Sequence, residues 1–400
     1  MAARERRIIL LRLTLAAVAL TVAAFGSALS AGAPLRFDPA TLAQVIALGP
    51  WPPAAAHDAS NRVSGQPRAI AFGEVLFHSA RLSSVGGLRC ASCHEPWRGF
   101  TDGRALGLGA APGARNTLSL HNVGQQRWFG WGGANDSLWA QSIRPLLDPR
   151  EMGVDAAHVG ALVRGDAALA RLYAQAFGAA PAAGNDEALL VDIGKALAAY
   201  EETIVTPRTP FDAFRDALER GDGDAAAARY PRDAQRGLAL FVGRGRCIAC
   251  HTGAGFRDGL FHRSRIVSTL ADGTPDTGRA AGIKHLAASR YTRLGRFNDA
   301  PADPSARALE SAPGDAGAVN DFRTPGLREV ALTGPYMHDG SVVSLCEAMR
   351  PHAALAGDIG SGEAAPELSS AERRDLVAFL LTLSARELPP FVDRATLACP

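Results

Sequence analysis

Two short cysteine motifs carry the most specific chemistry in this 400-residue chain. They read Cys90-Ala91-Ser92-Cys93-His94 and Cys247-Ile248-Ala249-Cys250-His251, about one domain's length apart. In a C-x-x-C-H motif each thiol can add to one vinyl group of a porphyrin, and the histidine can then bind its iron. A single copy would also suit a redox-active cysteine pair or half of a zinc site. Two copies, each with its histidine, favour two covalently bound haem c groups.

The segments around both motifs have a mainly helical pattern. Apolar spacing predicts a short helix before each motif, at 70–77 and 234–241, and further helices over 154–177 and 187–204. A helix also starts after Ser369, where Glu372 completes a capping box. The stretches 95–135 and 253–325 are long and irregular, which is typical of functional loops. No segment has a clear strand pattern, and residues 34–68 are expected to be extended. We predict a mainly α fold with two tandem cytochrome c-like haem domains and long irregular loops.

The first 33 residues have the plan of a secretory signal peptide. Residues 4–12 are basic, 13–25 are apolar, and small residues follow. The apolar run is too short for a comfortable transmembrane helix, so we expect no stable membrane span once the signal is removed. Export to the periplasm also fits the cofactor, because bacteria attach haem c outside the cytoplasm. The predicted domains are 1–33 (signal), 34–206 and 207–390, with a boundary at Pro207 and Pro210.

The charge balance does not indicate a nucleic-acid partner. The formal net charge is +2, but the signal carries four arginines and one glutamate, so the mature chain is slightly acidic. Two cysteines, Cys346 and Cys399, remain outside the haem motifs. They could pair in an oxidising compartment, but the sequence does not show that their Cα atoms come close enough. We therefore favour unpaired thiols over a disulfide.

The order of several further motifs resembles the bacterial dihaem cytochrome c peroxidases and their MauG-type relatives, including the MbnH-like branch. These motifs are Trp131-Gly132-Gly133, Gln141, Pro145, Arg150-Glu151-Met152-Gly153, Thr324-Pro325-Gly326-Leu327-Arg328 and the segment 332–340 (LTGPYMHDG). The resemblance covers roughly residues 70–385, and its motifs are specific. It implies a peroxide-reacting haem in the N-terminal domain and an electron-transfer haem in the C-terminal domain.

The resemblance assigns catalytic roles around the first haem. His94 would bind its iron, and Gln141, Pro145 and Glu151 would line its opposite face. Cleavage of the peroxide O–O bond needs a proton moved from one oxygen to the other, which a nearby carboxylate can do. Gln141 can donate a hydrogen bond, and Pro145 cannot bind iron. Trp131 corresponds to the family's tryptophan between the haems, a relay for electrons or holes; a core aromatic is the compatible alternative.

Further roles follow from the same resemblance. Asn116, Thr333 and Pro335 match the family's calcium site between the domains, and oxygen ligands suit that cation. Thr117-Leu118 departs from the usual local pattern, which contains a proline. His338 resembles a histidine beside the haems that bonds a propionate, and a buried structural histidine is the alternative.

Two departures from the family pattern concern the iron ligands. Many of these peroxidases cap the resting first iron with a histidine on the loop after the first motif, but no histidine lies between His94 and His121. We therefore expect an open first haem, as in MauG. The second iron takes a methionine or tyrosine seventeen residues after the proline matched by Pro335, a position that falls on His352. Met349 shares its helix face, so His352 is our preferred ligand and Met349 the alternative.

These residues lead to three functional hypotheses. The first is a peroxidase that reduces hydrogen peroxide at the haem of His94, with electrons relayed through the haem of His251 from a small periplasmic cytochrome c or cupredoxin. The second is a MauG- or MbnH-like oxidase that uses peroxide to oxidise aromatic residues of a partner protein. The third is a plain electron carrier, which would have no use for the acid Glu151 beside an open iron.

Overall fold

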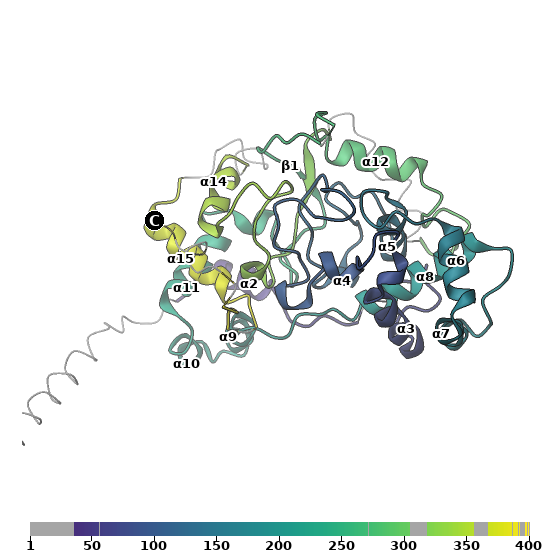
Figure 1. Ribbon diagram of the computed structural model, residues 1–400. Helices are drawn as coiled ribbons and strands as arrows, with labels where there is room; N and C mark the ends of the chain where they lie inside the picture. The colour runs from purple at the N-terminus through teal and green to yellow at the C-terminus, as the bar shows by residue number, and fades with distance from the viewer. Residues whose placement is uncertain are drawn as a thin grey trace, which may run out of the picture. The chain divides into compact units, whose positions relative to one another are not determined.

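A computed structural model describes residues 36–400 except 56, 271, 305–317, 356–366, 386, 391, 393–396, 398 and 400. The predicted signal peptide lies outside the described residues. Residues 37–400 form one unit, which is mainly helical (Figure 1). Among the described residues, no helix has the length and apolar character needed to cross a bilayer. The predicted fold class is therefore confirmed.

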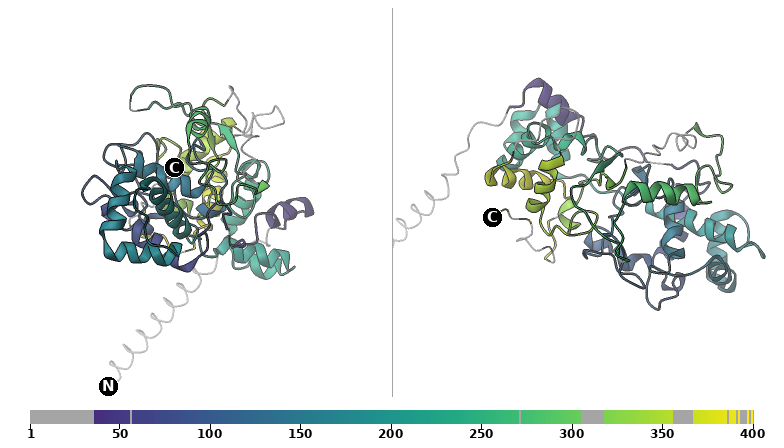
Figure 2. Two further views of the ribbon diagram at one scale, coloured as in Figure 1. Left: turned by 90° about the vertical axis from the view of Figure 1, so that its right-hand side faces the viewer. Right: turned by 90° about the horizontal axis from the view of Figure 1, so that it is seen from above.

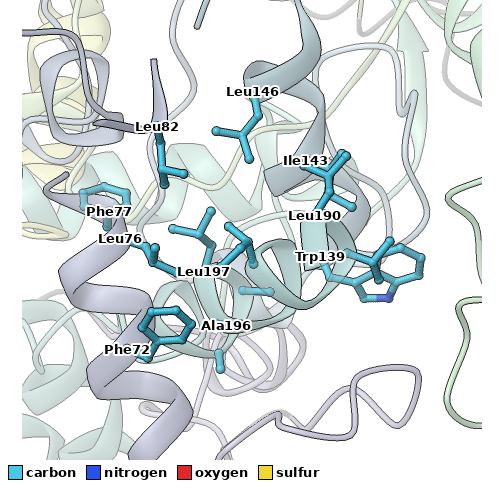
Figure 3. Close-up of a cluster of buried hydrophobic side chains, with 14 of the residues drawn as sticks. Phe72, Leu76, Phe77, Leu82, Trp139, Ile143, Leu146, Leu190, Ala196 and Leu197 are labelled. Atoms are coloured by element: carbon cyan, nitrogen blue, oxygen red, sulfur yellow. The ribbon is translucent and has the colours of Figure 1, made fainter. Parts of the chain in front are cut away.

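The first hydrophobic core lies in the N-terminal half and is built around one buried helix, α8 (Asp186–Glu201). It packs against α3 (Pro67–Phe77) and α5 (Leu138–Leu147), with α6 (Ala156–Gly165) and α7 (Ala167–Phe177) alongside. Side chains from α3, α5 and α8 meet in its interior (Figure 3). The contacts are close at two glycines: a Cβ on Gly73 would lie 2.0 Å from the Ala196 carbonyl oxygen, and one on Gly194 would lie 2.6 Å from Ile143. Larger residues there would push α8 away from its neighbours.

A second core lies in the C-terminal half. Its main helices are α9 (Pro210–Glu219), α11 (Arg232–Val242) and α15 (Ser370–Leu381), with the short α10 (Gly223–Ala227) and α14 (Leu345–Leu355) beside them. The rings of Phe211, Phe241, Phe256 and Phe379 pack together with centroids 5.1–6.3 Å apart. The predicted capping box at Ser369 is present. A separate core in each half is compatible with the boundary at residues 206/207, which stays a prediction.

The remaining elements are short and position the loops. They are α4 (Cys90–Cys93), α12 (Arg279–Ala288), the 3₁₀ turns η1 (Ala80–Leu82), η2 (Pro96–Arg98), η3 (Val123–Gln125), η4 (Cys247–Ala249) and η5 (Val330–Leu332), and two strands, β1 (Phe261–Arg263) and β2 (Asp321–Arg323). The strands pair antiparallel, with His262 opposite Phe322. The long loops predicted around both motifs are thus present, and the sheet joins the two ends of the second loop, 253–325.

Three local expectations were wrong. The segment 154–177 is two helices, because Asp166 caps the start of α7 and ends the pattern of α6. The segment 34–68 is not fully extended, since α2 (Pro39–Ile46) starts at an Asp38 cap. This helix packs against α9 and α11 of the second core, away from the N-terminal half (Figure 2, right). Strands also occur, but each is only three residues long, too short to give a pattern.

The preference for unpaired thiols at Cys346 and Cys399 was also wrong. The two cysteines form a disulfide with a Cα–Cα distance of 5.2 Å, across 53 residues of sequence. Both side chains lie in or against the second core, which brings the chain end back to the start of α14. Only the packing of the C-terminal segment creates this proximity, so no local pattern could reveal it.

Candidate functional site

The two cysteine motifs hold their histidines in the same way. The backbone N–H of His94 donates to Cys90 and that of His251 to Cys247, both at 2.9 Å. Each imidazole then bonds through Nδ1 to a phenylalanine carbonyl, that of Phe100 at 3.0 Å or of Phe256 at 3.1 Å. Such a bond fixes the tautomer and leaves Nε2 to bind a metal. Burial lowers the pKa of both histidines, His251 to about 4, so both are neutral, the form that binds iron.

A second repeat follows each motif and went unused in the sequence analysis. It reads Gly-Phe-x-Asp, at 99–102 and at 255–258. Both phenylalanines adopt positive φ angles, 57° and 52°, which turn their carbonyls back to the histidine. Non-glycine residues rarely adopt this conformation, and it persists where the surroundings enforce it. The repeated tetrapeptide could have identified the partner of each histidine.

A cavity of about 930 Å³ adjoins the second motif. This volume is at the upper end of the usual range for small-molecule and cofactor sites. Cys247, Cys250, His251 and His352 line it. The rings of His251 and His352 have centroids 6.0 Å apart. Because metal–imidazole bonds are about 2 Å long, this separation leaves room for one metal ion between the rings.

Helix α14 presents His352 to the cavity. The Nδ1 atom of His352 lies 2.6 Å from the Ala348 carbonyl oxygen one turn earlier, which leaves Nε2 available as a ligand. Met349 also lines the cavity, but it packs against the second core as well. The ring contact with His251 therefore favours His352 as the facing ligand, and the assignment stays a prediction.

Buried arginines of the cavity fit the two carboxylates that a haem carries. Arg323 is 4% exposed, and burial lowers its pKa to about 9. Burial and the nearby Arg328 lower the pKa of Arg257 to about 10. The Arg323 Nε donates to the Gly130 carbonyl, and the Arg257 Nη2 donates to the Asn122 carbonyl. No carboxylate of the described residues pairs with either guanidinium, so the propionates of a haem would supply the missing anions. Sequence reasoning missed both arginines.

The first motif lies beside the loop that carries Glu151. Leu108 accepts a bond from the Cys93 thiol at 3.5 Å, and two residues later Ala110 donates to the Glu151 carbonyl at 3.0 Å. Burial, together with the charges of Asp102 and Glu151, raises the pKa of the Cys93 thiol to about 11. Glu151 is thus near the first motif, although 57 positions separate it from His94 in the numbering.

The predicted catalytic residues Gln141, Pro145 and Glu151 come together through one turn. Gln141 and Pro145 are one helical turn apart on α5 and share a face. After α5 the chain reverses, and Met152 donates to the Pro145 carbonyl at 3.0 Å. Gly153, at φ 63°, completes the reversal. The turn therefore returns Glu151 to the end of the helix.

Two side chains that sequence reasoning missed orient these groups. Arg144 forms an ion pair with Glu151, whose side chain is 33% exposed. Asn135 donates to the Gln141 side-chain oxygen at 2.8 Å, which leaves the Gln141 amide N–H groups free to donate. The chain thus offers a carboxylate in the turn after α5 and an amide donor on α5, the groups that acid–base work on a peroxide needs.

Trp131 and His338 lie next to each other in the lining of the cavity. Their rings are 6.4 Å apart, and the Trp131 indole N–H donates to the Asn116 carbonyl at 2.8 Å. His338 stacks on Phe322 at 3.7 Å and its Nε2 lies 2.9 Å from the Ser268 hydroxyl. His338 is 2% exposed, and this engaged nitrogen is compatible with the structural alternative. Its propionate bond remains a prediction.

The predicted calcium residues Asn116, Thr333 and Pro335 also line this cavity. The Asn116 amide nitrogen donates to the Arg104 carbonyl at 2.8 Å, so its side-chain oxygen is the atom available to a cation. Three neutral oxygens are fewer than the six to eight that Ca²⁺ takes, so water would complete the shell.

Comparisons with known proteins agree with this arrangement. The family model of di-haem cytochrome c peroxidases matches residues 67–220. The methylamine utilization protein MauG of Methylorubrum extorquens is 38% identical over 80% of this chain and 79% of its own length. The cytochrome-c peroxidase IdrP1 of Denitromonas iodatirespirans is 32% identical over 92% of this chain and 93% of its own. The crystal structure of a MauG-like protein associated with microbial copper homeostasis matches with a TM-score of 0.61 and 26% identity, covering 88% of this chain and 99% of that one.

Proposed function

This chain belongs to the di-haem cytochrome c peroxidase family, and on that premise we propose that it reduces hydrogen peroxide beside His94 with electrons relayed past His251. The family relation makes the protein a peroxide-using oxidoreductase with two haem c groups. The division of labour between the two sites is our inference. The observation that supports it is a difference between the two motifs: the His352 ring lies 6.0 Å from that of His251, whereas Glu151 lies near the first motif and follows the helix α5 that carries Gln141 and Pro145.

The residues of the first site would handle the protons of the reaction. Bound haem supplies the exchange of two electrons with peroxide. Glu151 takes the proton from one peroxide oxygen and returns it to the other, while Gln141 donates a hydrogen bond from its free amide nitrogen. Arg144 pairs with the Glu151 carboxylate and fixes its orientation. With two electrons and two protons, one hydrogen peroxide leaves as two waters.

The residues between the sites would carry the electrons. Trp131 lies in the central cavity with its indole N–H fixed by Asn116. His251 and His352 would hold the second iron from both sides, which leaves no position for peroxide there. The electron donor would be a small periplasmic cytochrome c or cupredoxin. A periplasmic location follows from the predicted signal at 1–33, and Ca²⁺ at Asn116, Thr333 and Pro335 remains part of the proposal.

A second candidate is the oxidation of aromatic residues on a partner protein. Two observations favour it: the 38% identity to MauG over most of the chain, and the second imidazole at His352. Imidazole donates electrons more strongly than a thioether, so it would ease oxidation of the second iron. His352 in place of a thioether ligand would therefore suit the oxidation of a protein substrate.

Peroxide titration of the oxidised holoprotein tests the proposal. One equivalent should shift the Soret band at once, because we expect the first site to be open at rest. A response that requires prior reduction would contradict an open site. Rapid turnover with a reduced cytochrome c or cupredoxin supports the first candidate. Slow turnover with these donors, together with a mass change in a co-expressed partner protein, supports the second.

A further inference from the structure

Four of the five tryptophans are buried, and cationic side chains lie over three of them. Arg279 lies 4.6 Å and Arg127 5.5 Å from the Trp128 ring centroid. Lys195 lies 5.5 Å from Trp139, and Arg328 lies 3.8 Å from Trp51. Trp131 is the exception: in the described part of the chain no arginine or lysine lies over its ring. Its polar contacts are the edge of the His338 ring and the carbonyl of Asn116.

A cation over an indole opposes its oxidation. Loss of one electron makes the ring positive, and a positive charge within about 5 Å then repels it. The repulsion is strong where the pair is buried, because little water screens it. A carbonyl oxygen on the indole N–H has the opposite effect, since it stabilises positive charge on the ring.

We propose that Arg279 and Lys195 shield Trp128 and Trp139 from oxidation and thereby confine the oxidising equivalent to Trp131. The proposal rests on the peroxide chemistry proposed above and specifies its electron route. Arg279 and Lys195 are positioning residues in this scheme, because they act through the tryptophans and touch no reacting atom.

Arg279 is the stronger shield. Its side chain is 2% exposed, and its Nη1 donates to the carbonyls of Gly132 and Gly133 at 3.2 and 2.8 Å. The Nε and Nη2 atoms are buried without a hydrogen-bond partner among the described residues, so no carboxylate offsets the charge. Burial lowers its pKa only to about 10, so the guanidinium stays charged at neutral pH. Trp128 needs such a shield because it lies three residues from Trp131 in the same loop.

Lys195 protects the tryptophan on the helix of the first site. Trp139 is fully buried at the edge of the first core, two residues before Gln141 (Figure 3). The Lys195 ammonium is held by the Phe297 carbonyl at 2.8 Å and by Asp299 at 2.6 Å. Asp299 offsets part of the charge, so this shield is weaker than that of Arg279. Arg328 over Trp51 is offset more completely, by two bonds to Asp212.

Peptide mass spectrometry of the holoenzyme after excess peroxide, without an electron donor, tests the proposal. In Arg279→Gln, two electrons leave the Trp128 indole, one oxygen atom is added to it, and hydrogen peroxide leaves as one water. We expect oxidised Trp128 to rise about tenfold or more over the wild type. Arg279→Lys keeps the positive charge, so the amount of oxidised Trp128 should stay near the wild-type level. The Arg279 guanidinium also lies 4.1 Å from the Phe261 ring centroid. Phe261→Leu loosens this packing without removing the charge, so the oxidation of Trp128 should again stay near the wild-type level.

The outcomes separate charge from packing and from the proposed function. An equal rise in Arg279→Lys or Phe261→Leu would mean that packing protects Trp128, and the proposal would fail. A normal Soret response to peroxide in Arg279→Gln with no rise at Trp128 would overturn the proposal while leaving the peroxide chemistry intact. No Soret response in the wild type would remove both. Should Arg279→Gln not bind haem, Lys195→Gln against Lys195→Arg, read at Trp139, decides the matter by the same criteria.

Discussion

The two haem motifs share one support and differ in what faces them. In both, the histidine bonds a phenylalanine carbonyl held at positive φ, and burial lowers the histidine pKa. Opposite His251 stands a second imidazole from α14. Near the first motif the chain instead has Glu151, in the turn that follows α5, and Gln141 and Pro145 on that helix are predicted to face the same haem. The histidines of the two motifs are therefore held by the same repeated local structure. The residues predicted to lie across from each histidine differ, and our functional proposal depends on that difference.

The two halves also differ in the partner of a buried carboxyl group. In the second half, Asp212 and Arg328 are both 1% exposed and pair through two bonds. In the first half, Glu201 is buried and accepts a hydrogen bond from the Ser142 hydroxyl at 3.0 Å. Burial raises the pKa of Glu201 to about 8. The second half is thus stabilised by a compensated pair, and the first carries a carboxyl that must stay protonated.

Replacing Glu151 should produce the largest effect, on the rate of the peroxide reaction, and should change the first site only. Glu151→Gln removes the proton shuttle, so the Soret response to peroxide should slow by about 10²–10⁴-fold, the usual contribution of a general acid–base. Haem content and the spectrum of the second site should not change. Stopped-flow absorbance measures the rate. Glu95→Gln, which removes the ion pair with Arg98 beside the same motif, is the matched control. An unchanged rate in Glu151→Gln would remove Glu151 from the reaction.

Removal of the disulfide should loosen the second half alone. Cys346→Ser/Cys399→Ser opens a link across 53 residues, which should cost about 2–4 kcal/mol of unfolding free energy. The link is at the start of α14, so the spectrum of the second haem should be lost at lower urea than in the wild type. The first core has no cystine among its described residues and is the internal control. Simultaneous loss of both haem signals would show that the halves unfold as one.

Exchange of the facing ligand tests the asymmetry directly. His352→Met replaces an imidazole by a thioether and should raise the reduction potential of the second haem by on the order of 0.1 V. Spectroelectrochemistry measures the shift, and the first haem should keep its potential. Met349→Leu preserves volume and should leave both potentials unchanged. A shift in Met349→Leu rather than in His352→Met would assign the ligand one turn earlier.

The smallest effect concerns pH and the first core. Since the pKa of Glu201 is raised to about 8 in the folded state, the fold retains a proton that the unfolded chain releases above about pH 4.5. Unfolding free energy should therefore fall as pH rises from about 4.5 to 8, by on the order of 1–3 kcal/mol. Glu201→Gln should remove most of this slope in urea melts, and the exposed Glu74→Gln should retain it. A slope that persists in Glu201→Gln would place its origin elsewhere.

Sequence and structure contributed differently to the candidate site. The histidines His94 and His251 could be found from sequence because each follows its cysteine pair directly, within one turn of chain. The order of Gln141, Pro145 and Glu151 was also readable, since a single helix and turn connect them. Arg257, Arg323 and Asn135 were missed, because nothing local distinguishes an arginine at a cavity from one on the surface. The Gly-Phe-x-Asp repeat was readable as well, and it would have predicted the carbonyls that hold both imidazoles.

The sequence by itself determined that this chain has two haem motifs and a mainly helical fold, and it predicted Glu151 as the acid for peroxide chemistry, because each of these depends on residues close together in the chain. Only the tertiary structure decided that the His352 ring lies against the His251 ring and that Cys346 pairs with Cys399. It also decided which tryptophans lie under cationic side chains. These contacts join residues far apart in the chain. Their distances depend on how helices and loops pack, and side-chain packing has no signature in local spacing.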